Sequence, residues 1–187
     1  ESVHPDPAYR EIAGACKLRV GAFASELALS RPLYRVLSLV DLSGANNHTQ
    51  RFLALELEDF RRAGVDRSEP TRARLAQLNQ EMEALKQTFE RNLREDTRYL
   101  ELRGVDELAG MPQDYVESHA ADADGLIRIS TKYPDYLPLM TYADRGDVRR
   151  RMAHVFGTRG WPANEAVFRQ LLEKRQEYAD LLGYDNY

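Results

Sequence analysis

The stretch SEPTRARLAQLNQEMEALKQTFERNL, from Ser68 to Leu93, decides the fold. Ser68 suits the N-cap of a helix, and Pro70 suits its first turn. Apolar side chains then recur at steps of three and four residues: Leu75, Leu78, Met82, Leu85, Phe89 and Leu93. This period predicts a long amphipathic helix. Because the stripe lasts only about three heptads and the neighbouring segments are amphipathic too, we favour packing within a domain over a coiled coil.

The same helical period recurs on both sides of this stretch. Asp6 is the expected N-cap of a long first helix, Ser30 caps a short second one, and Gly64 ends a third that begins near Thr49, after a loop at 43–47. The stripe of the first helix comprises Tyr9, Ile12, Ala13, Cys16, Val20, Phe23 and Leu27. Further helices are expected at 112–120, 135–143, 147–158 and 164–182. The sequence therefore predicts a mainly α, multi-helix fold.

Two segments depart from the helical period. Residues 97–103 and 126–131 alternate apolar and polar side chains, which predicts a small antiparallel β ribbon within about 97–131. The sequence contains no repeat of fixed period and no long linker. We therefore expect a single helical domain over residues 1–187.

Composition narrows the classes of protein. The net charge of -4 argues against a nucleic-acid binder that depends on a basic surface. No apolar run approaches the roughly 20 residues of a membrane helix, and no signal-peptide pattern opens the sequence. A single cysteine excludes an internal disulfide. We expect a cytoplasmic chain with no nucleic-acid or membrane partner. Because it begins at Glu1 rather than Met, we also expect that an upstream part is missing.

Motifs for catalysis or metal binding are not found in the sequence. None of the four histidines lies three or four residues from another, and His-Glu-x-x-His does not occur. Cys16 is expected to be a buried, inert thiol of the first helix, and His154 a packing residue. Carboxylate pairs such as Glu56 with Asp59 fit solvated helix faces better than acid–base catalysis. We therefore assign no catalytic and no metal-binding residue.

Two segments remain candidates for binding. The tyrosine-rich stretch Tyr133–Tyr142 fits a packed core and also fits a peptide groove, and the core is the better local interpretation. The run Arg149-Arg150-Arg151, which Arg145 and Arg159 could extend, fits an anionic partner such as a peptide carboxylate. A solvated face with ion pairs to Asp144 and Asp147 is the better interpretation.

Eleven collinear segments resemble the thimet oligopeptidase and oligopeptidase A family of zinc metallopeptidases. They cover nearly the whole chain, and their order makes the resemblance specific although each is weak alone. The segments are VHPD (3–6), LSRPLY (29–34), DFRRAGVD (59–66), LNQEM (78–82), TFERNL (88–93), LAGMP (108–112), 133–143, 149–159, NE (164–165), 172–175 and LLGYDNY (181–187). One departure is the bridge at 160–163, which is longer in many members.

The resemblance implies that this chain is the amino-terminal, non-catalytic helical part of a zincin-type oligopeptidase. In that family a His-Glu-x-x-His helix and a downstream glutamate hold zinc, beyond the part that resembles this chain. The catalytic domain is therefore expected to be absent. Zinc is expected in the full-length parent and none bound to this chain, which should itself be inactive.

The resemblance also implies a role for the chain. It would form one wall of a channel that admits short peptides, next to a carboxy-terminal catalytic domain that hydrolyses internal bonds of oligopeptides. The candidate peptide-contact residues are Tyr133, Tyr136, Tyr142, Arg149 and Arg150. The alternative function is a stand-alone helical module that binds peptides or a protein and has no hydrolase activity.

Overall fold

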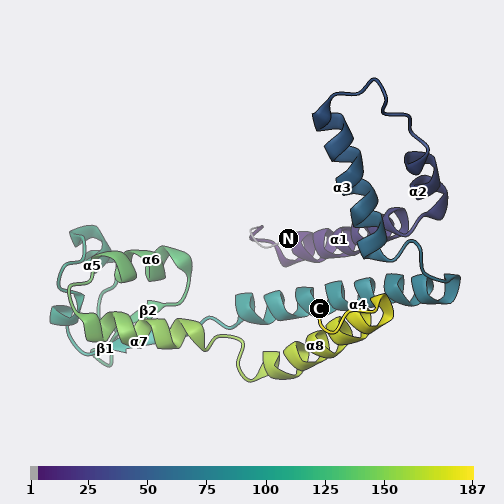
Figure 1. The fold of residues 1–187 in the computed structure, drawn as a ribbon. Helices are drawn as coiled ribbons and strands as arrows, with labels where there is room; N and C mark the ends of the chain where they lie inside the picture. Colours follow the sequence, from purple (N-terminus) through teal and green to yellow (C-terminus); the bar gives the residue numbers. More distant parts are fainter. Residues whose placement is uncertain (1–3) are drawn as a thin grey trace. The chain divides into compact units, whose positions relative to one another are not determined.

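The computed structural model describes residues 4–187, so Val3 of the first resembling segment lies outside the described residues. Within this range the fold is mainly α with one small antiparallel ribbon, as predicted (Figure 1). The α-helices are α1 (Pro7–Ala28), α2 (Arg31–Ser38), α3 (Asn47–Ala63), α4 (Glu69–Glu95), α5 (Gln113–Ser118), α6 (Tyr133–Tyr142), α7 (Gly146–Gly157) and α8 (Ala163–Leu182). The strands are β1 (Tyr99–Leu102) and β2 (Ile127–Ser130), and a 3-10 turn covers Val105–Leu108.

The described residues gather into two compact units. The first contains residues 4–88 and Ala166–Tyr187, and the second contains Phe89–Glu165. Helices α4 and α8 each contribute residues to both units. The expectation of one domain over 1–187 stays a prediction.

Helix α4 supplies the core of the first unit, as its sequence predicts. Ser68 caps it: its hydroxyl accepts from the Thr71 backbone N–H at 3.4 Å and hydrogen-bonds the Thr71 hydroxyl at 2.8 Å. Leu75, Leu78 and Met82 are buried, and Leu75 packs with Leu29 and Leu182. Ion pairs hold α8 beside α4, Arg74 with Glu177 at 2.6 Å and Lys174 with Glu81 at 2.7 Å (Figure 1).

The predicted caps at Asp6 and Gly64 are confirmed, whereas several predicted helix bounds differ by one or two residues. Asp6 accepts from the Ala8 N–H at 2.9 Å, and Gly64 ends α3 in the left-handed conformation with φ 96°. Helix α3 begins at Asn47, two residues before the predicted start, because Asn46 acts as its N-cap. The Asn46 side chain accepts from the Thr49 N–H at 2.9 Å.

Helix α1 corrects the sequence interpretation. Its large apolar stripe is exposed to solvent, and Cys16, predicted to be buried, is exposed as well. Gly14 instead is the buried residue of α1, and the Gln87 side chain of α4 donates to its carbonyl at 3.2 Å. Small residues of α1 such as Gly14 thus face α4, although Leu18 and Phe23 also line cavities shared with that helix.

The ribbon forms the centre of the second unit. β1 and β2 pair antiparallel with Leu100 opposite Ile129 and Leu102 opposite Ile127, and these four side chains are buried. Helix α6 contacts β2, and α7 contacts β1. The remaining buried members of this core are Leu108, Tyr115, Leu139, Ala143, Val148 and Met152. The ribbon is thus confirmed, and the core explains why both strands alternate.

Two glycines provide a matched test of the first unit. A Cβ at Gly64 would lie 2.5 Å from Leu75 Cδ1, and its φ of 96° strains an L-residue. Gly21, in the middle of α1, has no atom within 4 Å of its Cβ position. We expect Gly64→Ala to lower the free energy of unfolding by about 1–3 kcal/mol, and Gly21→Ala to raise it by about 0.5–1 kcal/mol. Urea denaturation measures both. Equal effects of the two changes would contradict this account.

Candidate functional site

Two of the predicted contact residues meet on the surface of the second unit. The Tyr136 ring of α6 stacks on Phe156 of α7, with centroids 3.8 Å apart and 20° between the planes. Tyr133, one turn earlier, meets Phe156 edge-on at 5.9 Å. Tyr136 is half-buried against the core, whereas Tyr133 is 61% exposed. The core interpretation therefore holds for Tyr136, while Tyr133 offers an open aromatic surface.

Arg159 completes this group. Its guanidinium lies 3.6 Å from the centroid of the Phe156 ring, a cation–π contact. Because Tyr136 and Arg159 are both within 4 Å of the same ring, they occupy opposite faces of Phe156. Arg159 also donates to the carbonyls of Phe156 at 3.1 Å and Thr131 at 3.4 Å. We call Tyr133, Tyr136, Phe156 and Arg159 the aromatic–arginine cluster.

The other predicted residues do not join the cluster. Tyr142 is at the far end of α6, about 13 Å of helix rise from Tyr133, and is exposed. Arg149 donates to the Ala143 carbonyl, and Arg150 is exposed. In the described chain no hydrogen bond or ion pair of the Arg150 side chain is found. The structure thus brings together Tyr133 and Tyr136 alone of the five.

The ion pairs predicted for the arginine run form in part. Asp147 pairs at 3.1 Å with Arg145, the residue that could extend the run, and not with Arg149, Arg150 or Arg151. Arg151 reaches across to the buried Glu107 at 2.5 Å and also donates to the Glu101 carbonyl. Burial alone would raise the pKa of the Glu107 carboxyl. Hydrogen bonds from the Arg103 backbone N–H and the Arg151 guanidinium outweigh this effect, so the pKa is lowered. This face of α7 is therefore occupied by structural pairs.

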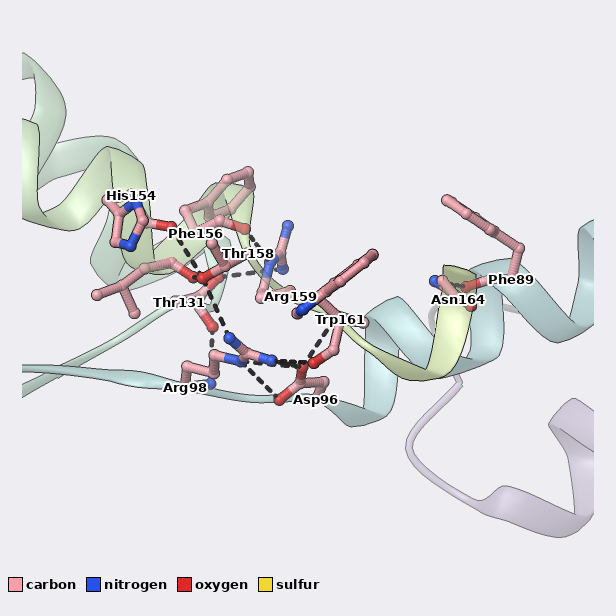
Figure 2. A network of polar contacts seen from close by, with 12 residues as sticks. Phe89, Asp96, Arg98, Thr131, His154, Phe156, Thr158, Arg159, Trp161 and Asn164 are labelled. Carbon is pink, nitrogen blue, oxygen red and sulfur yellow. Dashed lines mark hydrogen bonds and ion pairs between the residues drawn. The ribbon is translucent and has the colours of Figure 1, made fainter. Parts of the chain in front are cut away.

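A polar network fixes the segment that carries Arg159 (Figure 2). Arg98 pairs with Asp96 at 2.8 Å, and donates to the Thr158 hydroxyl at 3.1 Å and the Trp161 carbonyl at 2.7 Å. Asp96 in turn accepts from the Gly160 N–H at 2.7 Å. The network joins the chain before β1 to the chain after α7. It therefore holds both neighbours of Arg159 in place.

The charge of Asp96 depends on this network. The hydrogen bond from Arg98 and the Gly160 N–H lower the pKa of the Asp96 carboxyl against the opposing effect of burial. The Asp96 side chain is 30% exposed, so solvent screens this pair only in part.

Asn164, about one helical turn after Gly160, also joins two segments that are distant in sequence. Its buried side chain accepts from Asn92 at 2.8 Å and donates to the Phe89 carbonyl at 3.1 Å, and its backbone N–H donates to the Gly160 carbonyl at 2.7 Å (Figure 2). The partners in these three hydrogen bonds are backbone carbonyls and a side-chain amide. We therefore interpret Asn164 as structural, although it belongs to one of the resembling segments.

A serine, a histidine and an aspartate also lie close together at the start of α6. His119 Nε2 is 3.4 Å from Asp135, and its Nδ1 is 2.8 Å from the Tyr115 carbonyl. Nδ1 must carry the proton to bond that carbonyl, so it is no base for Ser118, whose hydroxyl donates to the same oxygen at 2.9 Å. The Tyr115 hydroxyl donates to the Asp135 carbonyl at 2.8 Å. These contacts fasten α5 to α6 and do not form a nucleophile.

The side chains that could bind a zinc ion are dispersed over the described residues. Among residues 4–187 no three histidine, cysteine, aspartate or glutamate side chains gather to hold a metal. His154, predicted to pack, is exposed on α7. The side chains of residues 4–187 therefore offer no donor set for a zinc ion. No helix in this range is long and apolar enough to span a membrane.

Comparison with known proteins identifies the class. No family model matches the chain. It is 30% identical to oligopeptidase A of Haemophilus influenzae over 146 residues, 70% of this chain and 21% of that protein. It is 28% identical to saccharolysin of Saccharomyces cerevisiae over 145 residues, 74% of this chain and 20% of that protein. The thimet-like oligopeptidase of Dictyostelium discoideum is 23% identical over 193 residues, 97% of this chain and 28% of that protein.

These matches, together with the mainly α fold, identify the chain as part of a protein of the oligopeptidase class. The chain belongs to the thimet oligopeptidase and oligopeptidase A family. It spans between 20% and 28% of the length of these three relatives.

One member of the cluster, Phe156, was missed by the sequence analysis. Arg159 was considered only as a possible extension of the arginine run, and both residues lie within the resembling segment 149–159. Their three-residue spacing lets Arg159 fold back on the Phe156 ring and carbonyl, a usable signal at a helix end. The stacking of Tyr136 on Phe156 joins residues 20 apart in sequence, and no local pattern indicates it.

The network predicts the acid sensitivity of the second unit. Because the folded pKa of Asp96 is lowered, its contribution is present above the unfolded pKa, about 3.9, and is lost as pH falls through the folded pKa. We expect Asp96→Asn to lower the free energy of unfolding at pH 7 by roughly 1–2 kcal/mol and to flatten its decline below pH 5. Urea denaturation at several pH values measures this. Asp124→Asn, at a carboxyl 76% exposed, is the control and should change little. Identical pH profiles for wild type and Asp96→Asn would contradict the assignment.

Proposed function

We propose that this chain is the amino-terminal, non-catalytic part of a zinc-dependent metalloendopeptidase of short oligopeptides, and that it forms one wall of the substrate channel. The matches to oligopeptidases over 20–28% of their length support a role as one part of a larger enzyme. Its partners would be the carboxy-terminal catalytic domain and oligopeptide substrates. Hydrolysis would be carried out by that domain, and this chain would bind and orient the peptide.

The single observation that carries the proposal is the aromatic–arginine cluster. Tyr133 exposes an aromatic ring that can stack on an apolar peptide side chain. Beside it, Arg159 uses Nε and one Nη for the carbonyls of Phe156 and Thr131, and its second Nη is left to donate. A peptide has both features that this pair recognises, side chains that stack and carbonyl or carboxylate oxygens that accept.

The cluster is also preorganised. Phe156 is held between Tyr136 and the guanidinium, so neither face of its ring must be ordered when a ligand binds. Asp96 and Arg98 hold the backbone after Arg159 at Gly160 and Trp161, and Arg98 holds the Thr158 hydroxyl before it. A surface that is already ordered loses little conformational entropy on binding, which favours the capture of small, flexible ligands.

We propose a cytoplasmic location for the chain. Support comes from the relative named probable cytosolic oligopeptidase A of Arabidopsis thaliana, which is 26% identical over 88% of this chain. A fractionation of cells that express the full-length protein would test this proposal.

Peptide binding is tested by titrating the isotope-labelled chain with a peptide of about ten residues that contains phenylalanine. We expect amide shifts at Tyr133, Phe156 and Arg159. Tyr133→Ala should weaken binding roughly threefold to tenfold, because it removes an aromatic contact and leaves the buried core intact. Tyr99→Ala, at a tyrosine 54% exposed in the same unit, is the matched control. Equal affinities of the two variants, or no shifts at all, would contradict a role of the cluster.

Catalysis is tested separately with a quenched fluorescent oligopeptide. We expect no cleavage by the purified chain, with zinc added or with a chelator, because the described residues form no cluster of metal ligands. The product would be followed by fluorescence and mass spectrometry. Cleavage that a chelator abolishes would overturn the non-catalytic role, whatever the outcome of the binding experiment.

A further inference from the structure

The surface around Arg159 continues onto the bridge that follows α7. Trp161 comes two residues after Arg159 and is 57% exposed. Consecutive Cα atoms are about 3.8 Å apart, so the Cα atoms of these two residues lie within about 7.6 Å of each other. Figure 2 shows both side chains on the side of the polar network opposite to Asp96. Trp161 and Arg159 are therefore neighbours on one surface.

Backbone hydrogen bonds hold Trp161 in place. Its carbonyl accepts from the Arg98 guanidinium at 2.7 Å, and its N–H donates to the Thr158 carbonyl at 3.3 Å. Gly160, one residue earlier, donates to Asp96 at 2.7 Å and has a φ of 76°, a conformation that favours glycine. The chain thus turns at Gly160, and the next side chain, the indole, is exposed.

Two donors on this surface have no partner in the protein. Arg159 uses Nε and one Nη for backbone carbonyls, which leaves its second Nη. The indole Nε1–H of Trp161 makes no hydrogen bond to another of the residues 4–187. A carboxylate has two oxygens that accept hydrogen bonds, and a guanidinium binds it more strongly than it binds a neutral carbonyl. The pair of donors therefore suits a carboxylate.

The charges nearby also favour an anion. Over residues 4–187 neither Arg159 nor Lys132, the N-cap residue of α6, takes part in an ion pair. The Asp96 carboxylate is already bound by Arg98 at 2.8 Å. The Asp135 carboxylate is likewise bound, by a serine hydroxyl and opposite a histidine. The two cations thus keep a charge that attracts an anion and repels a cation.

Two exposed aromatic rings accompany these donors. Tyr133 is 61% exposed on α6, and Trp161 adds a second open ring after α7. The Arg159 guanidinium covers the Phe156 ring, which Tyr133 meets edge-on. Aromatic rings contact apolar side chains, and the donors bind a carboxylate. The C-terminal residue of a peptide carries both of these groups.

We propose that Trp161, together with Arg159 and Tyr133, forms a subsite for the C-terminal residue of a peptide. The subsite prefers an apolar or aromatic residue that carries the free carboxylate. This inference rests on the proposed peptide-binding function of the cluster. Trp161 lies in the bridge at 160–163, where this chain departs from many members of the family, so the preference is inferred from the residues of this chain alone.

The ligand chemistry is tested by fluorescence, because Trp161 is the only tryptophan of the chain. The 187-residue chain is titrated with a short peptide that ends in phenylalanine, once as the free acid and once as the C-terminal amide. We expect the acid to change the indole emission and the amide to bind roughly threefold to tenfold more weakly, because it lacks the charge. Equal affinities would overturn the proposal. So would an amide with an internal glutamate that binds as tightly as the acid, since the carboxylate would then come from a side chain.

The role of the indole is tested with Trp161→Ala, followed by amide shifts of the isotope-labelled chain. In wild type we expect phenylalanine at the C-terminus to bind at least about threefold more tightly than glycine, and in Trp161→Ala this preference should largely disappear. Tyr99→Ala, at an exposed tyrosine of the same unit, is the matched control and should keep the preference. Circular dichroism would show that both variants keep their helices.

The outcomes separate this inference from the proposed function. If no peptide shifts the amides of Tyr133 and Phe156, the peptide-binding function fails, and the subsite fails with it. If peptides bind and Tyr133→Ala weakens them, but Trp161→Ala keeps the preference for phenylalanine, only the subsite is overturned.

Discussion

The second unit depends on one guanidinium. Arg98 binds the Asp96 carboxylate, the Thr158 hydroxyl and the Trp161 carbonyl, while its own backbone N–H donates to the Thr131 hydroxyl at 3.0 Å. The guanidinium thus joins the nearby Asp96 to the segment after α7, and the backbone N–H adds Thr131 from the end of β2. A planar fork with several fixed donors suits the three contacts of the side chain. A lysine would supply one charged point and leave most of these acceptors unmatched. The position of Arg159, and with it the cluster, follows from this arrangement.

The elements of the fold were largely predictable because their signals are local. The apolar period of α4 buries Leu75, Leu78 and Met82, and the two alternating segments become a ribbon whose apolar residues Leu100, Leu102, Ile127 and Ile129 are buried. Caps follow from side chains within three residues, as at Asp6 and Ser68. Such features need no knowledge of the rest of the chain.

The orientation of α1 was not predictable in the same way. Its period correctly indicates a helix, but a period does not say which face meets a neighbour. Small residues such as Gly14 allow the approach to α4, and the apolar stripe with Cys16 is left outside. The expectation of burial failed there because it assumed that the largest apolar face always packs inward.

The candidate site was likewise predictable only where its contacts are local in sequence. Tyr133 and Tyr136 are one turn apart, so their proximity is a local property of α6. Their contact with Phe156 depends on how α6 and α7 cover the ribbon. Arg149 and Arg150 were chosen for charge, but Arg149 is held by the Ala143 carbonyl, and the cation that reaches the aromatic rings is Arg159. Charge in the sequence does not show which guanidinium will be fixed beside a ring.

The chemistry of the aromatic–arginine cluster bears on what it could bind. Arg159 keeps one Nη beyond its two carbonyl contacts, and it lies beside the exposed ring of Tyr133. The contacts of Asp96 and Arg98 with the segment after α7 support this arrangement. A preorganised donor next to an open aromatic surface is a feature of sites that orient a polar ligand, and the peptide role proposed for the cluster rests on this chemistry.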